Sequence, residues 1–275
     1  FSFCVSLQKV TFPENSEAQI IESSAFNDSQ IESIKIPSDI VLEEGCFDAT
    51  NKLVNIKIFP RNNKENFLYF EDKMIIGKSD MKSDNFNVLL FARRDIKKAV
   101  IPSNIEIISP CAFDNCSYLK TIEIQADSKL IKIGRNAFSY SLISSIYFPN
   151  NLTELEDEWQ IGTNLKTIEI SPLNKNFIYN DNKFLLRKSD PKSNKFDFWV
   201  YARRDIEEAI IPQSVSIILS NAFDECTQLE KVSIQSNVNS IGHYAFYNCN
   251  NLKTVEFAKN SKLRYIGKHA FCSTG

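Results

Sequence analysis

The chain has 275 residues, of which 43% are apolar and 24% charged, a composition typical of a folded protein with a sizeable core. Its formal net charge of −2 gives no global positive field, so we expect neither nucleic acid nor an anionic membrane surface as a partner. No apolar run approaches the roughly 20 residues that a membrane-spanning helix requires, so we expect no membrane span in this chain.

Aromatic residues, most of them preceded by alanine, recur along the chain and define its period. They fall into three triplets that repeat after about 110 residues, and the spacing within a triplet is 21 to 25 residues. These markers are Phe1, Phe26, Phe47, Phe113, Phe138, Trp159, Phe223, Phe246 and Phe271. A period of this length is typical of solenoids, in which one unit buries its apolar face only by stacking on its neighbours.

A second motif, Leu-x-x-Ile-x-Ile, lies between the markers, and its last three positions alternate apolar, polar and apolar. It begins at Leu7, Ile31, Leu53, Ile96, Leu119, Ile143, Leu165, Ile206, Leu229 and Leu252. Alternation with β-branched residues predicts strands that are buried on one face. We therefore expect about ten strands, stacked side by side as a parallel sheet along one face of a solenoid.

The segments that return the chain from one strand to the next are too short for a long helix. They show no sustained helical period, so we expect them to be irregular or to form a short helical turn. Gly134, Gly242 and Gly267 recur in these segments as Ile-Gly-x-x-Ala-Phe. We expect glycine there to supply the positive φ of a tight corner.

Two longer segments, at about 60–95 and 171–205, interrupt the period and are copies of each other. In each, apolar and aromatic runs flank a polar turn, KSDMKSDN or KSDPKSNK. This pattern predicts two β-hairpin insertions, at about Phe67 to Phe91 and at about Phe177 to Tyr201.

Residues 1–275 show one period from start to end, so we expect a single solenoid domain that carries both hairpins. Both ends of the chain fall within a repeat. We therefore expect this domain to be a fragment of a longer array.

Residues 241–257, IGHYAFYNCNNLKTVEF, join the two motifs in one unit. This unit resembles the consensus LxxIxIPxxVxxIGxxAFxxCxxL of the BspA-like, or Treponema pallidum-type, leucine-rich repeats, and the resemblance covers nearly the whole chain. It implies a leucine-rich-repeat solenoid, in which hairpin insertions are common. It also implies a cell-surface or secreted adhesin-like protein, of the kind found in bacteria and in mucosal protozoa such as trichomonads, which binds host cells, matrix proteins or other microbes.

We expect the aromatic markers to stack as a buried structural spine. Its members are Phe26, Phe47, Phe113, Phe138, Trp159, Phe223, Phe246 and Phe271. Trp159 follows Glu158 where other units have Ala-Phe, so we expect that return to differ locally. Cysteines at a fixed position after the marker, such as Cys116 and Cys226, fit buried thiols better than a disulfide, and the absence of a CxxC pair argues against a metal site.

The polar positions of the strands point away from the core, onto a face that the stacked strands expose. The candidate ligand-binding residues on it are Lys35, Lys57, Lys98, Glu123, Tyr147, Glu169, Glu208 and Glu256. Four lysines and no acidic residue precede Thr121 at these positions, whereas four glutamates and one lysine follow it. Two interpretations remain open: the polarised face orients a protein partner or a second copy of the chain, or its charges only keep the face soluble.

The tetrapeptide Ala-Arg-Arg-Asp occurs at 92–95 and again at 202–205, where each hairpin rejoins the solenoid. Paired arginines suit phosphate or carboxylate groups, which gives an anion-binding hypothesis. The alternative is that arginine and aspartate hold the corner through local ion pairs. Two identical joints explain two identical tetrapeptides more simply than two identical ligand sites do.

Searches for catalytic motifs find no GxGxxG, GxxxxGK, HExxH or GxSxG, and we expect no enzymatic activity, cofactor or bound metal. The function that fits is a non-catalytic protein-binding module, by resemblance part of a cell-surface or secreted adhesin whose ligand is a host cell-surface or extracellular matrix protein. The alternative is an intracellular leucine-rich-repeat scaffold or regulatory protein. A signal peptide or membrane anchor in a full-length sequence would favour the adhesin.

Overall fold

The computed structural model describes residues 1–163 and 165–275. They form a β-solenoid of strands joined by turns, and no helix occurs in these two ranges. The chain divides into two compact units. Unit 1 contains Phe1–Ile143 and Glu154–Thr163, and unit 2 contains Ser144–Thr153 and Asn164–Gly275.

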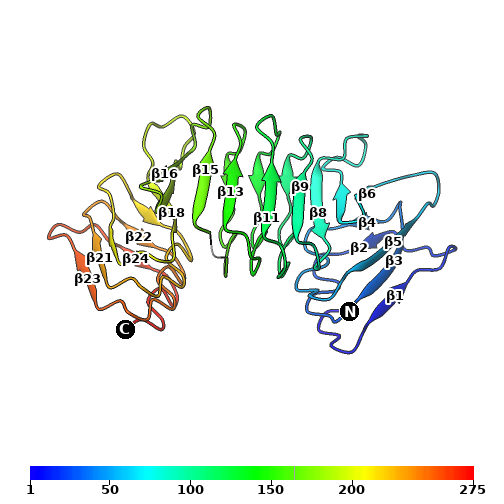
Figure 1. The fold of residues 1–275 in the computed structure, drawn as a ribbon, viewed down its shortest axis with the longest axis horizontal. Coiled ribbons are helices and arrows are strands. Elements are labelled where there is room, and N and C mark those ends of the chain that lie inside the picture. The colour runs from blue at the N-terminus through cyan, green and yellow to red at the C-terminus, as the bar shows by residue number, and fades with distance from the viewer. Residues whose placement is uncertain (164) are drawn as a thin grey trace. The chain divides into compact units, whose positions relative to one another are not determined.

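All ten strands predicted from the Leu-x-x-Ile-x-Ile motif are present, which confirms this part of the prediction. In unit 1 they are β1 (Lys9–Thr11), β3 (Ser33–Pro37), β5 (Asn55–Phe59), β9 (Lys98–Ile101) and β11 (Thr121–Ile124). In unit 2 they are β13 (Ser145–Phe148), β15 (Thr167–Ile170), β19 (Glu208–Ile210), β21 (Lys231–Ile234) and β23 (Thr254–Phe257). We call these strands the front row (Figure 1).

Parallel pairing within the front row is not continuous. In unit 1, β1, β3 and β5 form one parallel sheet, and β9 and β11 form a separate pair. In unit 2, β13 pairs with β15, while β19, β21 and β23 form a three-stranded sheet. Within each unit the break falls where the inserted segment leaves and rejoins the solenoid.

Each unit also has a second row of strands, each only two residues long, which pair in parallel with one another and have no counterpart in the sequence predictions. These strands are β2 (Ile20–Ile21), β4 (Val41–Leu42), β10 (Ile107–Ile108), β12 (Lys132–Ile133), β14 (Glu154–Leu155), β20 (Ile217–Ile218), β22 (Ser240–Ile241) and β24 (Tyr265–Ile266). In each of these strands except β24, the second residue is buried. The return segments are thus part strand and part turn, without the short helical turn that was one of our expectations.

Each insertion contains three antiparallel strands, one more than a simple hairpin. Those of unit 1 are β6 (Phe67–Phe70), β7 (Met74–Gly77) and β8 (Val88–Ala92), and those of unit 2 are β16 (Phe177–Asn180), β17 (Phe184–Arg187) and β18 (Phe198–Ala202). The last strand of each then pairs in parallel with the second row, β8 with β10 and β18 with β20.

The additional reversal in each insertion is a tight turn between its first two strands. Glu71 and Asp72 have φ of 50° and 52°, and Asp181 and Asn182 have φ of 53° and 52°. Two consecutive left-handed residues are the feature of a type I′ turn, which matches the twist of antiparallel strands. Asp-Asn fits this turn well, but Glu-Asp is a weak signal, which explains why only the longer polar turn was predicted.

The role predicted for Gly134, Gly242 and Gly267 is wrong, because none of them has a positive φ. Each instead lies against the backbone of the preceding turn. A Cβ atom at Gly242 would lie 2.4 Å from the Ser220 nitrogen, and one at Gly134 would lie 2.5 Å from the Pro110 nitrogen. These glycines are therefore required for the close approach of successive turns, which any side chain would force apart.

The left-handed conformation is supplied by other residues, which lie two positions before and two positions after each phenylalanine marker from Phe26 onward, and at Glu158 and Gly162 in the turn of Trp159. Cys111 and Asn115 flank Phe113 in this way, with φ of 57° and 56°. The N–H groups of Cys111, Phe113 and Asn115 each donate to a carbonyl of the next turn, at 2.8 to 2.9 Å. Alternation of left-handed residues therefore directs every second N–H group along the stack.

Seven of the aromatic markers, from Phe26 to Phe246, are buried in the core of their unit, whereas Phe271 is half-buried and Phe1 is exposed. In unit 1, Phe26 stacks on Phe47 with ring centroids 5.7 Å apart, and Phe113 on Phe138 at 5.2 Å. In unit 2, Phe223 stacks on Phe246 at 4.6 Å and Phe246 on Phe271 at 4.9 Å. Rings from the insertions extend both series, since Phe91 contacts Phe47 edge-on at 5.2 Å and Trp199 stacks on Phe223 at 5.1 Å.

Trp159 is shifted by one backbone position from the other markers. The Phe138 N–H donates to the Trp159 carbonyl at 2.9 Å, whereas the Phe113 N–H donates to that of Ala137 at 2.8 Å. Trp159 thus has the backbone position of the alanine, and Gln160 has that of the phenylalanine. The indole nevertheless remains buried, with its ring edge-on to Phe138 at 6.5 Å.

Candidate ligand-binding face

The exposed face of the front row follows from the alternation of its strands. In β11, for example, Ile122 and Ile124 are buried, whereas Thr121 is exposed and Glu123 half-buried. Because neighbouring strands are in parallel register, equivalent side chains form rows across the strands. The candidate residues therefore lie on one face of each unit, and the two units are described in turn.

In unit 1 the face carries lysines in direct register. Lys35 of β3 lies opposite Lys57 of β5. Lys35 reaches Glu14 at 3.8 Å, and its ammonium lies 4.7 Å from the centre of the Phe59 ring. Lys57 is exposed and has no ion-pair partner among the described residues. Like charges opposite each other destabilise a sheet, so this row is unfavourable without a partner.

The next strand pair of unit 1 is neutralised internally. The Lys98 ammonium of β9 lies 2.6 Å from a carboxylate oxygen of Glu123 on β11. Both side chains remain substantially exposed, so this ion pair contributes little to stability. The pairing also means that Lys98 and Glu123 do not act as isolated charges on this face.

In unit 2 the face is predominantly acidic. Tyr147 of β13 lies beside Glu169 of β15 in the parallel register. Glu169 and Glu208 are exposed and have no ion-pair partner among the described residues, whereas Glu256 lies 2.8 Å from Lys231. The ion pair lowers the pKa of Glu256, so its negative charge is fixed and locally compensated.

The candidate ligand-binding residues include no aliphatic side chain, yet Ile210 of β19 is 67% exposed on this face. Its equivalent in unit 1 is Val100 of β9, which is half-buried. The signal was present in the sequence, because both residues occupy polar positions of the strand motif.

The Ala-Arg-Arg-Asp tetrapeptides form the joints that one of the two interpretations predicted. Arg93 pairs with Asp95 at 2.6 Å and donates to the Asp72 carbonyl at 3.0 Å. Arg203 pairs with Asp205 at 2.5 Å and donates to the Asn182 carbonyl at 3.0 Å. The first arginine of each pair thus binds the strand to the type I′ turn of its insertion, and its charge is already compensated.

Arg94 is buried and binds carbonyl groups on both sides of the insertion. Its guanidinium donates to the carbonyls of Phe47 and Thr50 at 3.2 and 3.3 Å, and to that of Ala112 at 3.2 Å. It also lies over the Phe91 ring, 4.4 Å from the centroid. This arginine cannot reach an external anion, so the anion-binding hypothesis has no support at this corner.

Two carboxyl groups, Asp48 and Asp114, share the surroundings of Arg94. The pKa of Asp48 is raised to about 6, chiefly by burial and also by the charge of Asp114, which together outweigh a hydrogen bond from the Cys111 thiol and the charge of Arg94. Burial also raises the pKa of Asp114. One Asp48 oxygen has no hydrogen-bond partner among the described residues, so its ionised form is poorly accommodated.

Replacing Asp48 by asparagine should therefore stabilise the protein at neutral pH and not in acid. The raised pKa means that the folded state binds the proton more tightly than the unfolded state, so stability falls as pH rises from about 4 through 6. Asp48 is partly exposed, which limits the expected gain in unfolding free energy to about 1–2 kcal/mol at pH 7.5. Urea unfolding at pH 4.5 and 7.5 measures it, with the exposed Asp127→Asn as control. Equal gains at both pH values would contradict the prediction.

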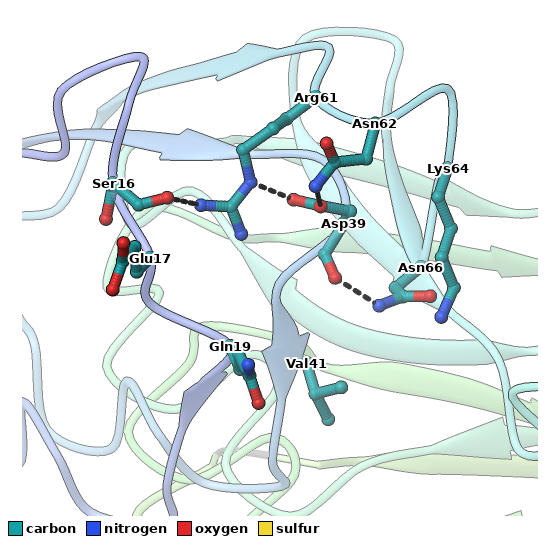
Figure 2. Close-up of a pocket in the computed structure, with 9 residues that line it drawn as sticks. All are labelled: Ser16, Glu17, Gln19, Asp39, Val41, Arg61, Asn62, Lys64 and Asn66. Atoms are coloured by element: carbon teal, nitrogen blue, oxygen red, sulfur yellow. Dashed lines mark hydrogen bonds and ion pairs between the residues drawn. The ribbon is translucent and has the colours of Figure 1, made fainter.

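A polar pocket of about 620 Å³ lies beside the start of the first insertion (Figure 2). Figure 2 shows Arg61 directed at Asp39, with the Arg61 Nε and an Asp39 oxygen 2.6 Å apart. Arg61 also donates to the carbonyls of Ser16 and Ala18, and Asn62 donates to Asp39 at 2.8 Å. Although burial opposes it, these hydrogen bonds keep the pKa of Asp39 low. The charges of Arg61 and Asp39 therefore compensate each other, and their hydrogen bonds hold the surrounding loops together.

The described residues contain no group of three or more His, Cys, Asp or Glu side chains that could hold a metal ion. The described residues also contain no helix of the length and apolar character needed to cross a membrane.

Stacked turns of 21 to 25 residues, a front row of parallel strands and a buried aromatic spine define a leucine-rich-repeat solenoid. Within this class, the chain belongs to the family described as "BspA type Leucine rich repeat region (6 copies)", whose model matches residues 1–88, 84–184 and 195–275. The family suggested by the sequence is thereby confirmed.

Three solved structures with a similar fold come from bacteria. One is a leucine rich cell surface protein from Faecalibacterium prausnitzii, with a TM-score of 0.60 and 18% identity over 97% of this chain and 73% of that chain. Another is the pneumococcal vaccine antigen PcpA, with a TM-score of 0.58 and 18% identity over 96% and 69% of the two chains. A third is a leucine-rich repeat protein from Eubacterium ventriosum, with a TM-score of 0.60 and 22% identity over 97% of this chain and 64% of that chain. At these identities the likeness shows a shared fold.

No curated protein matches the chain in sequence.

Proposed function

We propose that the chain is a non-catalytic protein-binding module of a cell-surface or secreted protein, and that its ligand is a host cell-surface or extracellular matrix protein. The observation that carries the proposal is the row of Lys35 and Lys57, which lie opposite each other on an exposed sheet face. A row of like charges is retained at a cost to the sheet, and an acidic protein surface bound across it would remove that cost.

The family and one protein of similar structure support this location and function. The Faecalibacterium prausnitzii protein of the same fold is described as a leucine rich cell surface protein. Leucine-rich-repeat solenoids present an extended surface of repeated strands, which suits contact with another protein better than enclosure of a small molecule. In the polar pocket beside the first insertion, Arg61 and Asp39 already pair with each other, in agreement with this view.

Charge reversal on the face of unit 1 should weaken binding of such a ligand. We expect Lys35→Glu with Lys57→Glu to lower the association constant at least tenfold in 50 mM salt and much less in 500 mM salt, because screening removes the attraction. The measurement is pull-down from host-cell surface and matrix proteins, followed by titration of the captured protein. The control, Lys52→Glu with Lys129→Glu, changes the same net charge at exposed positions away from the face.

Equal binding by the two double variants would reject the strand face of unit 1 as the site. Glu169→Lys tests the face of unit 2 by the same assay, and it is preferable to a change at Glu123, which would also break the ion pair with Lys98. Surface biotinylation of intact source cells tests the location. Labelling supports a surface protein, and recovery only from the cell interior would favour an intracellular scaffold.

A further inference from the structure

Each insertion rejoins the front row through a corner, and the corner of unit 1 has the same contacts as the corner of unit 2. In both, the first arginine of the tetrapeptide pairs with the aspartate two residues later and binds a carbonyl of the type I′ turn. The chain then enters β9 or β19 through an isoleucine that is buried in each case, Ile96 or Ile206. The residues that follow are therefore presented by closely similar backbones.

The charge of the next two residues is reversed between the two corners. Unit 1 has Lys97 and Lys98 where unit 2 has Glu207 and Glu208, and all four are exposed. Two positions further along the strand, Val100 and Ile210 follow on the same exposed face. We call Lys97, Lys98 and Val100 the basic corner, and Glu207, Glu208 and Ile210 the acidic corner.

Most of these charges lack a partner within their own unit. Lys97, Glu207 and Glu208 form no ion pair among the described residues. Lys98 pairs with Glu123, but both side chains are more than 40% exposed, at 55% and 42%, so this pair is readily exchanged for another. The acidic corner thus combines two uncompensated carboxylates with an isoleucine that is 67% exposed.

We propose that a second copy of this chain docks here, the basic corner of one molecule on the acidic corner of the other. Each molecule carries both halves of the contact, and the shared backbone places a lysine pair and a glutamate pair at equivalent distances from an apolar residue. Opposite charges select this pairing and disfavour contact between two like corners. Ile210 and Val100 supply the apolar contact between the charges. The inference rests on the proposed use of the strand face for protein binding.

Charge-swapped variants of the purified chain test the proposal by sedimentation equilibrium in 50 mM salt. We expect the unaltered chain to self-associate in a concentration-dependent way and to dissociate in 500 mM salt. Variant A, Lys97→Glu with Lys98→Glu, has two acidic corners, and variant B, Glu207→Lys with Glu208→Lys, has two basic corners. Each alone should associate at least tenfold more weakly, and an equimolar mixture of A and B should associate again.

Three results would overturn the proposal. They are an unaltered chain that stays monomeric at every concentration in 50 mM salt, variants that associate as strongly as the unaltered chain, and a mixture of A and B that stays monomeric. Far-ultraviolet circular dichroism shows that each variant is folded. The double variant Lys52→Glu with Lys129→Glu controls for net charge, and Lys35→Glu with Lys57→Glu should associate normally. Loss of ligand capture by the latter alone would therefore separate the proposed function from self-association.

Discussion

Phe138→Ala is expected to lower the free energy of unfolding by about 3–5 kcal/mol. The Phe138 ring has no exposed surface, stacks on Phe113 at 5.2 Å with an interplanar angle of 15°, and contacts the edge of Trp159 at 6.5 Å. Its removal leaves a cavity in the middle of the spine of unit 1. In a solenoid each turn is stabilised mainly by its two neighbours, so the loss weakens two interfaces at once.

Urea unfolding followed by circular dichroism measures this loss, and Tyr118→Ala is the matched control. Tyr118 is an aromatic residue of the preceding turn, but its side chain is 58% exposed. We expect its removal to change stability by less than about 0.5 kcal/mol, as for other exposed positions. A loss below about 1 kcal/mol for Phe138→Ala would mean that the ring does not support the stack.

The front-row strands and the aromatic spine could be predicted because each has a strong local signal. Alternation around Ile122 and Ile124 states which side of β11 is buried, and a recurrent Ala-Phe marks the inward position of each turn. The second row could not be predicted in this way. Strands such as β12 have two residues, too few for any period, and they exist because backbone groups of successive turns meet.

The left-handed positions show the same limit. Asn115 and Asn136 tolerate a positive φ, and asparagine is an ordinary signal for it, but Cys111 and Tyr244 adopt the same conformation with no such preference. The stack imposes their backbone, and local sequence does not. The sequence therefore predicted the wrong role for the glycines. Gly242 is required because a Cβ atom there would collide with the preceding turn, and not because its backbone needs a positive φ.

For the candidate site, exposure was predictable and pairing was not. The strand period places Lys98 and Glu123 on the outer face, but their ion pair depends on register between strands 23 residues apart in sequence. The tetrapeptide sequence likewise does not indicate which of its two adjacent arginines is buried. Only the packing of the insertion against its neighbouring turns distinguishes Arg93, at the surface, from Arg94, in the core.

That distinction predicts opposite outcomes for two adjacent substitutions of the same kind. Arg94→Ala is expected to cost about 3–5 kcal/mol, because it removes the charged hydrogen bonds that join carbonyl groups of two turns and the positive charge beside Asp48 and Asp114. Arg93→Ala is expected to cost no more than about 1 kcal/mol, because it breaks an ion pair that is partly exposed. Urea unfolding of both variants measures the difference, and equal losses would contradict it.

Arg94→Lys sharpens the test, because it keeps the charge and removes the forked geometry. One ammonium cannot reach the Phe47 and Thr50 carbonyls on one side and that of Ala112 on the other, so we expect this variant to recover only part of the loss. Full recovery would mean that charge near Asp48 and Asp114 is what matters. Partial recovery would mean that the forked guanidinium holds together two turns of unit 1. The insertion separates these turns in the sequence, because the motif starts at Leu53 and Ile96 are 43 residues apart.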